Sequence, residues 1–396
     1  MSNLPLPRLA IITTHPIQYY APVFKLLHQR GHLAINVFYT WGRTSLTKYD
    51  PDFGQQVDWD IPLLEGYPYQ WVENTASNPG SHHFKGIVNP GLIAQINQWQ
   101  PTAILIFGWA YASHLRALVY YKGKLPVCFR GDSTLLDQTN GLRTVLRTIF
   151  LKWVYSHVEH SFYTGINNKA YFKKHGLKEE QLSFAPHAID NDRFAEDHFT
   201  EATGLRNSLG ISASDMLILF SGKLEDKKDP VLLLQAFLQL NLPHVHLLFA
   251  GSGALKSTLQ QRIQGNKHIH FIDFQNQGYM PVVYQACDLY CLPSKGPGET
   301  WGLAVNEAMA CGKAIVVSDK VGCAADLVKK DNGIIVKSQS LNELLTTLQY
   351  FTGNPARLRK FGRQSAQIIS DYSFLAVARA IEQAILADKN YIAGNQ

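Results

Sequence analysis

SKGPGETWGLAVNEAMACGKAIVVSD, residues 294–319, is the stretch that decides the fold of the second half of this chain. The apolar segment 288–294 leads into it and the apolar segment 314–317 ends it, so the pattern predicts a strand, a loop, a short helix and a second strand. Gly302 and Leu303 mark the turn where the helix begins. Unpaired N–H groups and the dipole at a helix start attract anions, so this stretch predicts an anion-binding loop.

Two carboxylates, Glu299 and Glu307, flank this turn with seven residues between them. Glu307 would lie about one turn into the helix, where its carboxylate could accept hydrogen bonds from both hydroxyls of a ribose. Glu299 lies in the loop before the helix, where it could reach a second ring. Two carboxylates around an anion-binding helix start indicate a site for a nucleotide sugar.

A chain of 396 residues is too long for one hydrophobic core, and its length predicts two domains. The formal charge of +6 is too small to argue for nucleic acid but is compatible with anionic ligands or an anionic membrane surface. The five cysteines are scattered, which favours free thiols in a reducing cytosol. Cys287 and Cys291 lack the neighbouring ligands that would complete a zinc site.

The first half opens with a predicted strand at 9–14, a helix that ends at Arg30, and a second strand at 33–39. This βαβ pattern predicts a parallel sheet with right-handed crossovers. We therefore expect the N-terminus to form the first strand rather than a signal peptide, and no apolar run reaches the ~20 residues of a membrane span. The first turn lacks the glycine pattern of a dinucleotide site, so we expect the nucleotide phosphates to bind elsewhere.

Three segments of the first half leave alternatives open. The aromatic-rich residues 41–90 predict loops and short strands, which could stack on a sugar or lipid-linked acceptor or pack beneath a long loop. Residues 142–157 predict a helix with basic residues beside a broad apolar face, which could lie on an anionic membrane or pack in the core. The polar residues 191–214 are typical of a linker between domains.

Polar residues follow predicted strands in both halves, at the edge where open α/β sheets bind ligands. Arg130 and Asp132 follow strand 126–129 and form either a ligand site or a loop salt bridge. Gly222 and the lysines after it follow strand 216–221, where they could neutralise a diphosphate or form a solvated surface. Phe274 follows strand 270–272, near where a base could bind.

These motifs resemble the family 4 glycosyltransferases over nearly the whole chain. GKLEDKKD from Gly222 is similar to the family's glycine-basic-leucine…lysine loop, and GETWGLAVNEAMACGKAIVVSD is similar to its Glu-x7-Glu signature. The resemblance implies an α/β GT-B fold, in which two Rossmann-like domains with parallel sheets face each other across a cleft. It divides the chain into an acceptor-side domain at 1–196, a nucleotide-sugar-binding domain at 197–370, and a C-terminal helix at 371–396 that crosses back to the N-terminal domain.

The resemblance also implies a retaining, metal-independent hexosyltransferase that needs no cofactor beyond a UDP- or GDP-linked sugar donor. Glu307 would hold the ribose and Glu299 the donor sugar. Lys223 and Lys228 would hold the diphosphate, where negative charge grows as the anomeric bond breaks. The remaining donor-side residues would be Gly302, Leu303, Thr300, Trp301, Gly222 and Phe274.

The acceptor and the location follow less directly. The acceptor would be a glycan, a lipid-linked sugar or a small molecule, and the enzyme would be cytoplasmic, with peripheral contact to the inner face of a membrane through 142–157 left open. Nucleic acid is not an expected partner.

Two departures from the family pattern put parts of this hypothesis in question. The family often has a glycine after the first glutamate, whereas this chain has Thr300 followed by Trp301, so we expect a narrower sugar pocket. The family's first-domain histidine is replaced near Arg130 and Asp132, and either of these or His15 could take its place.

Two other functions fit the same architecture. These are a nucleotide-sugar 2-epimerase and a non-catalytic nucleotide-sugar-binding protein. The Glu-x7-Glu signature favours the transferase over the epimerase, and the intact glutamates and lysines weigh against the non-catalytic reading.

Overall fold

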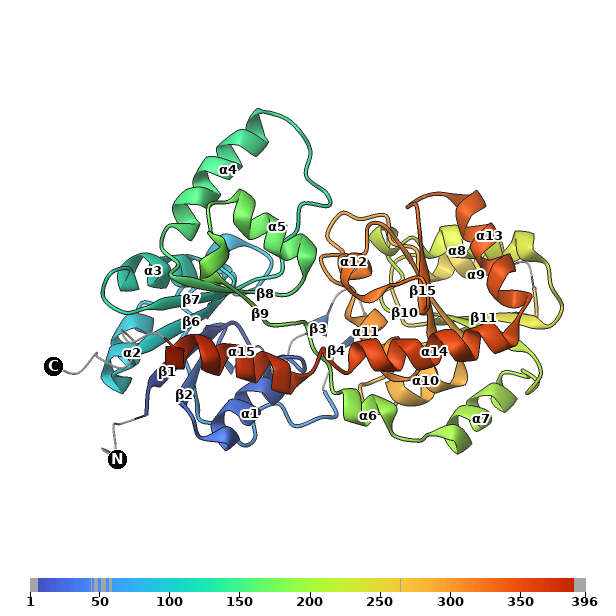
Figure 1. Cartoon of the computed structure of the whole chain (residues 1–396), viewed down its shortest axis with the longest axis horizontal. Coiled ribbons are helices and arrows are strands. Elements are labelled where there is room, and N and C mark those ends of the chain that lie inside the picture. Colours follow the sequence, from blue (N-terminus) through green and yellow to red (C-terminus); the bar gives the residue numbers. More distant parts are fainter. Residues whose placement is uncertain are drawn as a thin grey trace. The chain divides into compact units, whose positions relative to one another are not determined.

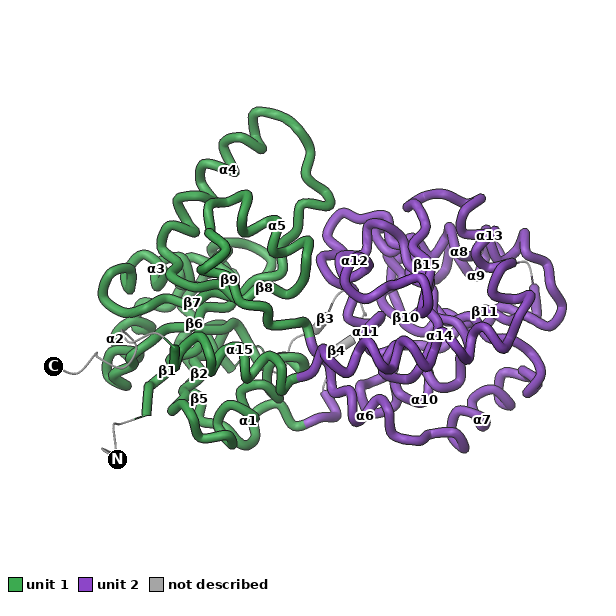
Figure 2. Tube along the Cα trace, viewed as in Figure 1, with its two compact units in different colours: residues 1–48, 62–187, 374–396 green, residues 49–61, 188–373 purple. Residues whose placement is uncertain are grey.

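The computed structural model describes residues 6–43, 45, 49–50, 55–56, 59–263 and 265–387. The chain forms two compact units (Figure 2), each built around its own parallel sheet. The first unit comprises Met1–Lys48, Pro62–His187 and Phe374–Gln396; the second comprises Tyr49–Ile61 and Ala188–Ser373. Both units are Rossmann-like, which is the predicted α/β class.

The first unit has a seven-stranded sheet in the order β5-β2-β1-β6-β7-β8-β9. The first strand, β1, lies inside the sheet; the chain then runs outward through β2 to β5 and returns to β6 on the other side of β1 (Figure 1). The strands are β1 (Arg8–Thr13), β2 (Ala34–Tyr39), β5 (Tyr69–Trp71), β6 (Ala103–Phe107), β7 (Val127–Arg130), β8 (His160–Tyr163) and β9 (Leu182–Phe184).

Helices of the first unit pack their apolar faces on this sheet; Ile104 and Ile106 of β6, for example, are fully buried in one core with Leu118 of α3. The helical elements are α1 (Ala21–Arg30), η2 (Phe84–Gly86), α2 (Leu92–Trp99), α3 (Ala112–Tyr121), α4 (Leu142–Tyr155), α5 (Ile166–Lys174), η3 (Glu179–Gln181) and α15 (Phe374–Ala387).

The last helix, α15, belongs to the first unit although it ends the described chain. It packs against α1, and the Arg30 guanidinium donates to the buried carboxylate of Glu382 through Nε at 2.8 Å and Nη2 at 2.9 Å. A bidentate arginine on a buried carboxylate holds two elements in a defined orientation. This pair ties the two ends of the chain together within one unit.

The second unit has a six-stranded sheet in the order β12-β11-β10-β13-β14-β15. Its strands are β10 (Met216–Ser221), β11 (Val245–Ala250), β12 (Ile269–Ile272), β13 (Leu289–Leu292), β14 (Ala314–Ser318) and β15 (Gly333–Val336), with the antiparallel pair β3 (Tyr49–Asp50) and β4 (Gln55–Gln56) apart from them. The helical elements are α6 (Asn191–Ala195), α7 (Phe199–Ser208), η4 (Asp226–Lys228), α8 (Pro230–Leu240), α9 (Lys256–Arg262), α10 (Met280–Ala286), α11 (Leu303–Ala310), α12 (Ala324–Leu327), α13 (Leu341–Thr352) and α14 (Pro355–Ile369).

The interpretation of residues 191–214 as a linker is wrong, because most of this segment folds into helices α6 and α7 of the second unit. Its polar residues serve as caps and anchors rather than as a solvated tether. Asp190 caps α6 by accepting from the Arg193 amide, and the Arg206 guanidinium of α7 donates to the carbonyl of Ala286 at 2.9 Å. Phe194 is fully buried.

Candidate functional site

The sheet of the second unit reverses its strand order between β10 and β13. From β10 the chain runs outward through β11 to β12, and from β13 it runs the other way through β14 to β15. The loops after β10 and β13 therefore leave neighbouring strands at the same edge, which is where open α/β sheets bind ligands. These two loops carry most of the residues that the sequence predicted.

Lys228 and Glu299 join the two loops directly. The ammonium Nζ of Lys228 lies 2.7 Å from Oε2 of Glu299, and the side chains are only 14% and 8% exposed. The Ser294 hydroxyl also donates to Oε2, at 3.3 Å. Each charge is neutralised by the other, so a ligand phosphate that enters here would compete with Glu299 for the lysine.

Glycines bring the loop after β10 close to the loop after β11. A Cβ on Gly251 would lie 2.2 Å from the carbonyl oxygen of Gly222, so only glycine fits there. The Gly222 amide donates to the carbonyl of Ala250 at 2.9 Å. Lys223, half-buried, follows Gly222 in this turn. The Lys228 side chain passes over Gly222, with its Cε 3.5 Å from where a Cβ on that glycine would lie. The result is a rigid turn with two lysines at its rim.

Helix α11 begins at Gly302, which takes a left-handed conformation with φ of 95°. A Cβ there would lie 2.9 Å from Cγ1 of Val321, so a larger residue would be both strained and crowded. No side chain caps this helix start, and Leu303 is its first residue. The Val305 amide donates to the Gly302 carbonyl at 2.9 Å, and Oε1 of Glu299 would lie 3.7 Å from a Cβ on Gly302, so the helix start lies next to the Glu299 carboxylate. A helix start of this kind is where anions bind.

The turn after β14 holds the Glu299 loop in place. The Gly322 amide donates to the carbonyl of Glu299 at 3.0 Å, and the Cys323 amide donates to the carbonyl of Trp301 at 2.9 Å. A Cβ on Gly322 would lie only 1.8 Å from the Thr300 carbonyl oxygen. Gly322 is thus a positioning residue that the sequence-based prediction missed, and its only signal there was a glycine next to the end of a strand.

Glu307 lies in the second turn of α11 and is buried. The Tyr284 hydroxyl donates to Oε2 of Glu307 at 2.7 Å, and Ser221 lies 2.7 Å from the same hydroxyl. Burial, and then the charge of Glu307, raise the pKa of Tyr284 well above its ordinary value, so it remains a donor. Tyr284 and Ser221 were also missed, because neither residue type stands out in an apolar strand or helix.

Trp301 is buried, and its indole Nε1 donates to Oδ1 of Asn306 at 2.9 Å. Its hydrogen-bonding edge is therefore directed at α11 itself. Thr300 and Phe274 are half-buried, and Phe274 makes an edge contact with Trp59, with ring centroids 6.5 Å apart. The proposed contacts of these residues with a donor stay predictions.

In the first unit, the guanidinium of Arg130 is bound to main-chain carbonyls. It is buried at the end of β7, and its Nη1 and Nη2 donate to the carbonyls of Ala185 and Pro186 at 2.8 and 2.9 Å. Burial lowers the pKa of Arg130, an effect that the nearby Tyr20 and Asp132 oppose. The arginine thus fastens the segment after β9 to the end of β7.

Asp132 and His187 lie beside this arginine. The Asp132 side chain is about half exposed, and its Oδ2 lies 3.9 Å from Nε2 of the buried His187. Burial and the charge of Arg130 lower the pKa of His187. The structure thus brings Arg130 and Asp132 together with a histidine that lies shortly after β9.

His15, the third candidate of the first half, lies on the loop after β1. Its Nδ1 lies 2.9 Å from the Thr14 hydroxyl, and its ring makes an edge contact with Trp41 at 5.2 Å. Within the described ranges, no group of three or more His, Cys, Asp or Glu residues is placed to hold a metal ion.

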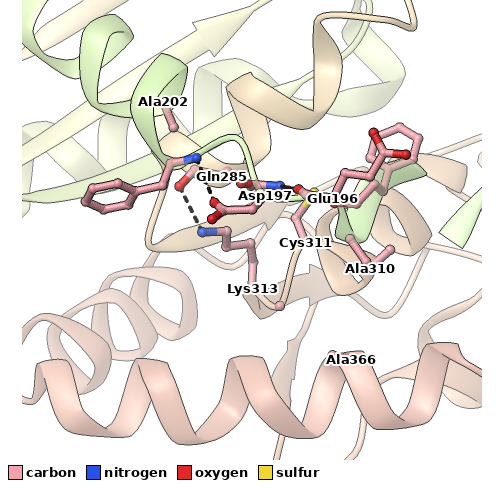
Figure 3. A pocket seen from close by; sticks show the side chains of 12 residues that line it. Glu196, Asp197, Ala202, Gln285, Ala310, Cys311, Lys313 and Ala366 are labelled. Atoms are coloured by element: carbon pink, nitrogen blue, oxygen red, sulfur yellow. Dashed lines mark hydrogen bonds between the residues drawn. The ribbon is translucent and has the colours of Figure 1, made fainter. Parts of the chain in front are cut away.

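A cavity of about 550 Å³ lies at the opposite edge of the second sheet, next to the residues that precede β14 (Figure 3). The Lys313 ammonium in its wall donates to the carbonyls of Gln285 and Cys287, at 3.0 and 2.8 Å. Burial raises the pKa of the Cys311 thiol, which lies in the same wall, above its ordinary range. The Lys313 ammonium is thus already hydrogen-bonded, and the Cys311 thiol stays protonated, so neither group gives this cavity a chemical function.

Two Rossmann-like units, the second with a lysine loop and a glutamate-bearing helix start at its switch point, define the GT-B class of fold. Solved structures share this fold. Anabaena HepE in complex with UDP aligns with a TM-score of 0.73 at 18% identity, over 97% of this chain and 100% of that chain. Sucrose-phosphate synthase from Thermosynechococcus elongatus gives a TM-score of 0.71 at 17% identity, over 96% of this chain and 98% of that chain.

Residues 202–367 match the family described as Glycosyl transferases group 1. A D-inositol 3-phosphate glycosyltransferase from Segniliparus rotundus is 25% identical over 208 residues, which cover 50% of this chain and 45% of that protein. The second unit is therefore similar to this glycosyltransferase family over the matched residues. It spans about half the length of the curated relatives it matches.

Proposed function

We propose that this protein is a retaining glycosyltransferase that moves a hexose from a nucleoside diphosphate sugar to an acceptor hydroxyl. One observation carries the proposal: the Lys228–Glu299 pair lies at the switch point of the second sheet, beside the uncapped start of α11. A cation, a carboxylate and a helix start without a side-chain cap, all at one sheet edge, match a diphosphate with a sugar attached.

Each residue then has a distinct role. Glu307, held from behind by Tyr284, binds the ribose hydroxyls, and Glu299 binds hydroxyls of the donor sugar. Lys228 exchanges Glu299 for the diphosphate when the donor binds, and Lys223 and the α11 amides share its charge. The bond between the anomeric carbon and the phosphate oxygen breaks as the bond to the acceptor oxygen forms, and the proton of the acceptor hydroxyl passes to the departing diphosphate. The two lysines and the helix amides stabilise the negative charge that grows on this leaving group.

The donor is a UDP- or GDP-linked sugar, and the similar fold of HepE in complex with UDP supports this choice. We propose that no metal is required, because two lysines and a helix start are available to neutralise the diphosphate. Activity should stay within about twofold of its original value when a chelator is added. Removal of a catalytic metal would raise the barrier by several kcal/mol and lower the activity far more.

The acceptor is a glycan, a lipid-linked sugar or a small molecule. We propose that the protein works in the cytoplasm and contacts the inner face of a membrane peripherally through residues 142–157.

The test is incubation with UDP- and GDP-sugars, with and without acceptors, while released nucleotide and the configuration of the product are followed. We expect acceptor-dependent release of nucleotide and a product that keeps the donor's anomeric configuration. An epimerised nucleotide sugar, or binding without turnover of any donor, would instead establish one of the two alternative functions.

A further inference from the structure

Helix α4 of the first unit exposes its large apolar side chains to solvent. Six of them lie between 40% exposed at Phe150 and 75% exposed at Leu142. Their spacing of three and four residues places them on one face of the helix. They are Leu142, Val145, Leu146, Ile149, Phe150 and Trp153, and we call them the α4 face.

The opposite side of α4 attaches the helix to the unit. Leu151, Val154 and Tyr155 are buried, and the ring of Tyr155 packs on Phe172 of α5 with centroids 5.4 Å apart. The helix therefore already has its core contact, and the α4 face is a second apolar surface. A contiguous exposed apolar surface of this kind marks an interaction site.

Basic residues border the α4 face. Arg143 and Arg147 lie on one side of it and Lys152 on the other, by their helical positions, and all three are exposed. Neither α4 nor α5 contains an acidic residue. In the part of the chain that the structure describes, no carboxylate forms an ion pair with these three side chains. The surface is thus apolar in the middle and positive at its borders.

We propose that the first unit docks on an anionic lipid bilayer through the α4 face, with the helix lying in the plane of the headgroups. Apolar side chains that enter the acyl boundary, with Lys and Arg on the polar flanks, are the pattern of an interfacial helix. Trp153, packed beside Phe150 at 5.7 Å, is the residue type that prefers this depth. Helix α4, with 14 residues, is too short to cross a bilayer, and none of the described helices could do so.

Charge argues against the other occupants of this surface. A second copy docked face to face would bring the same arginines and lysine together, which is repulsive. A nucleic acid would pair with the basic border but leave the apolar face in water. An anionic bilayer satisfies both parts. This inference deepens the proposed function. A lipid-borne acceptor follows from the docking only if the protein is a glycosyltransferase, whereas the docking itself does not depend on that function.

The test is flotation of the full-length protein with phosphatidylcholine vesicles, with and without phosphatidylglycerol. We expect binding that needs the anionic lipid and weakens as salt rises. Ile149→Glu should lower the partition coefficient at least about tenfold, and the double variant Arg143→Ser with Lys152→Ser by about twentyfold. The matched control is Val119→Glu, at an exposed apolar position of α3 outside the α4 face, which should bind like the wild type.

Thermal melting and donor hydrolysis on the same preparations keep the two proposals separate. Donor turnover without vesicle binding would overturn the docking and leave the transferase standing, and vesicle binding without turnover would do the reverse. Equal binding to neutral vesicles would overturn the anionic-lipid proposal. So would unchanged binding of Ile149→Glu, or a wild-type dimer that this substitution converts to a monomer.

Discussion

The carboxyl edges of the two sheets carry charged residues that are held in different ways. In the second unit, Lys228 is paired with the side chain of Glu299, and a ligand can replace either partner. In the first unit, Arg130 is bound to the main-chain carbonyls of Ala185 and Pro186, which no ligand can displace without unfolding the segment. A charge that is paired with another side chain can serve chemistry, whereas a charge that is bound to the backbone maintains the fold.

The two edges also differ in how their loops are fixed. In the second unit, Gly251 and Gly322 allow backbone to touch backbone, and the side chains stay available. In the first unit, the long side chain of Arg130 holds the segment after β9 at the end of β7. Changes to the charged side chains of the second edge should therefore affect activity, whereas changes to those of the first edge should affect stability.

The largest effect is expected from Lys228→Ala. Under the proposed function the lysine acts on charge that grows in the transition state, so kcat/KM should fall about thousandfold, or ~4 kcal/mol, with kcat affected more than donor affinity. Steady-state kinetics with the preferred donor measures this. Glu307→Ala should show the opposite split, with weaker nucleotide binding as its main effect.

Lys227→Ala is the matched control, because Lys227 lies in the same loop and pairs with Glu225 at 3.3 Å rather than with Glu299. Its kcat/KM should stay within about twofold of the wild type. A loss of less than about twofold for Lys228→Ala itself would refute the diphosphate role and remove the contrast between the two edges.

The next effect concerns how the second edge is fixed. In Gly322→Ala the new methyl group would overlap the Thr300 carbonyl, so the turn must move and both of its hydrogen bonds to the Glu299 loop must weaken. We expect a loss of about 3 kcal/mol in the free energy of unfolding and a weaker donor affinity. Urea denaturation and nucleotide titration measure the two.

Gly204→Ala controls for the loss of glycine as such, since this glycine lies inside α7 with no atom within 4 Å of its added methyl group. It should stabilise the protein by about 0.5–1 kcal/mol. Equal stability of Gly322→Ala and the wild type would show that the close approach does not fix the loop.

Sequence reasoning could predict the second edge because its signals are local. Gly222, Lys228, Glu299 and Glu307 follow strand patterns, and neighbouring strands bring them together. Residues whose partners are carbonyls or distant hydroxyls give no such signal, which is why Tyr284 behind Glu307 escaped notice. The same limit applies to α4, since periodicity defines its apolar face but not whether another element covers it.

The first edge should be the more sensitive to acid. The buried His114 has a pKa lowered by burial to about 4, and that of His187 is lowered as well. Because the folded protein holds these groups neutral, their contribution to stability is complete above pH ~6.5 and decreases as the pH falls toward ~4. His114 alone should contribute a loss of about 2 kcal/mol at pH 5.

Urea midpoints measured between pH 7 and pH 4 test this prediction, with His187→Asn as the variant. Removing the titrating ring should flatten the pH dependence. A wild-type stability that does not change over this range would contradict the buried neutral histidines.

The smallest effect distinguishes two roles for Trp301, anchoring helix α11 or contacting the donor sugar. Trp301→Phe removes the hydrogen bond to Asn306 and should reduce the free energy of unfolding by about 1 kcal/mol, since the bond is buried and α11 loses one anchor. If the indole serves the helix rather than the sugar, the ratio of kcat/KM values for two donor sugars should not change. Thr300→Gly, at the half-buried neighbour in the same loop, should change that ratio. A changed ratio in Trp301→Phe would instead assign Trp301 to the sugar pocket, because an anchor acting only through α11 would affect both donors equally.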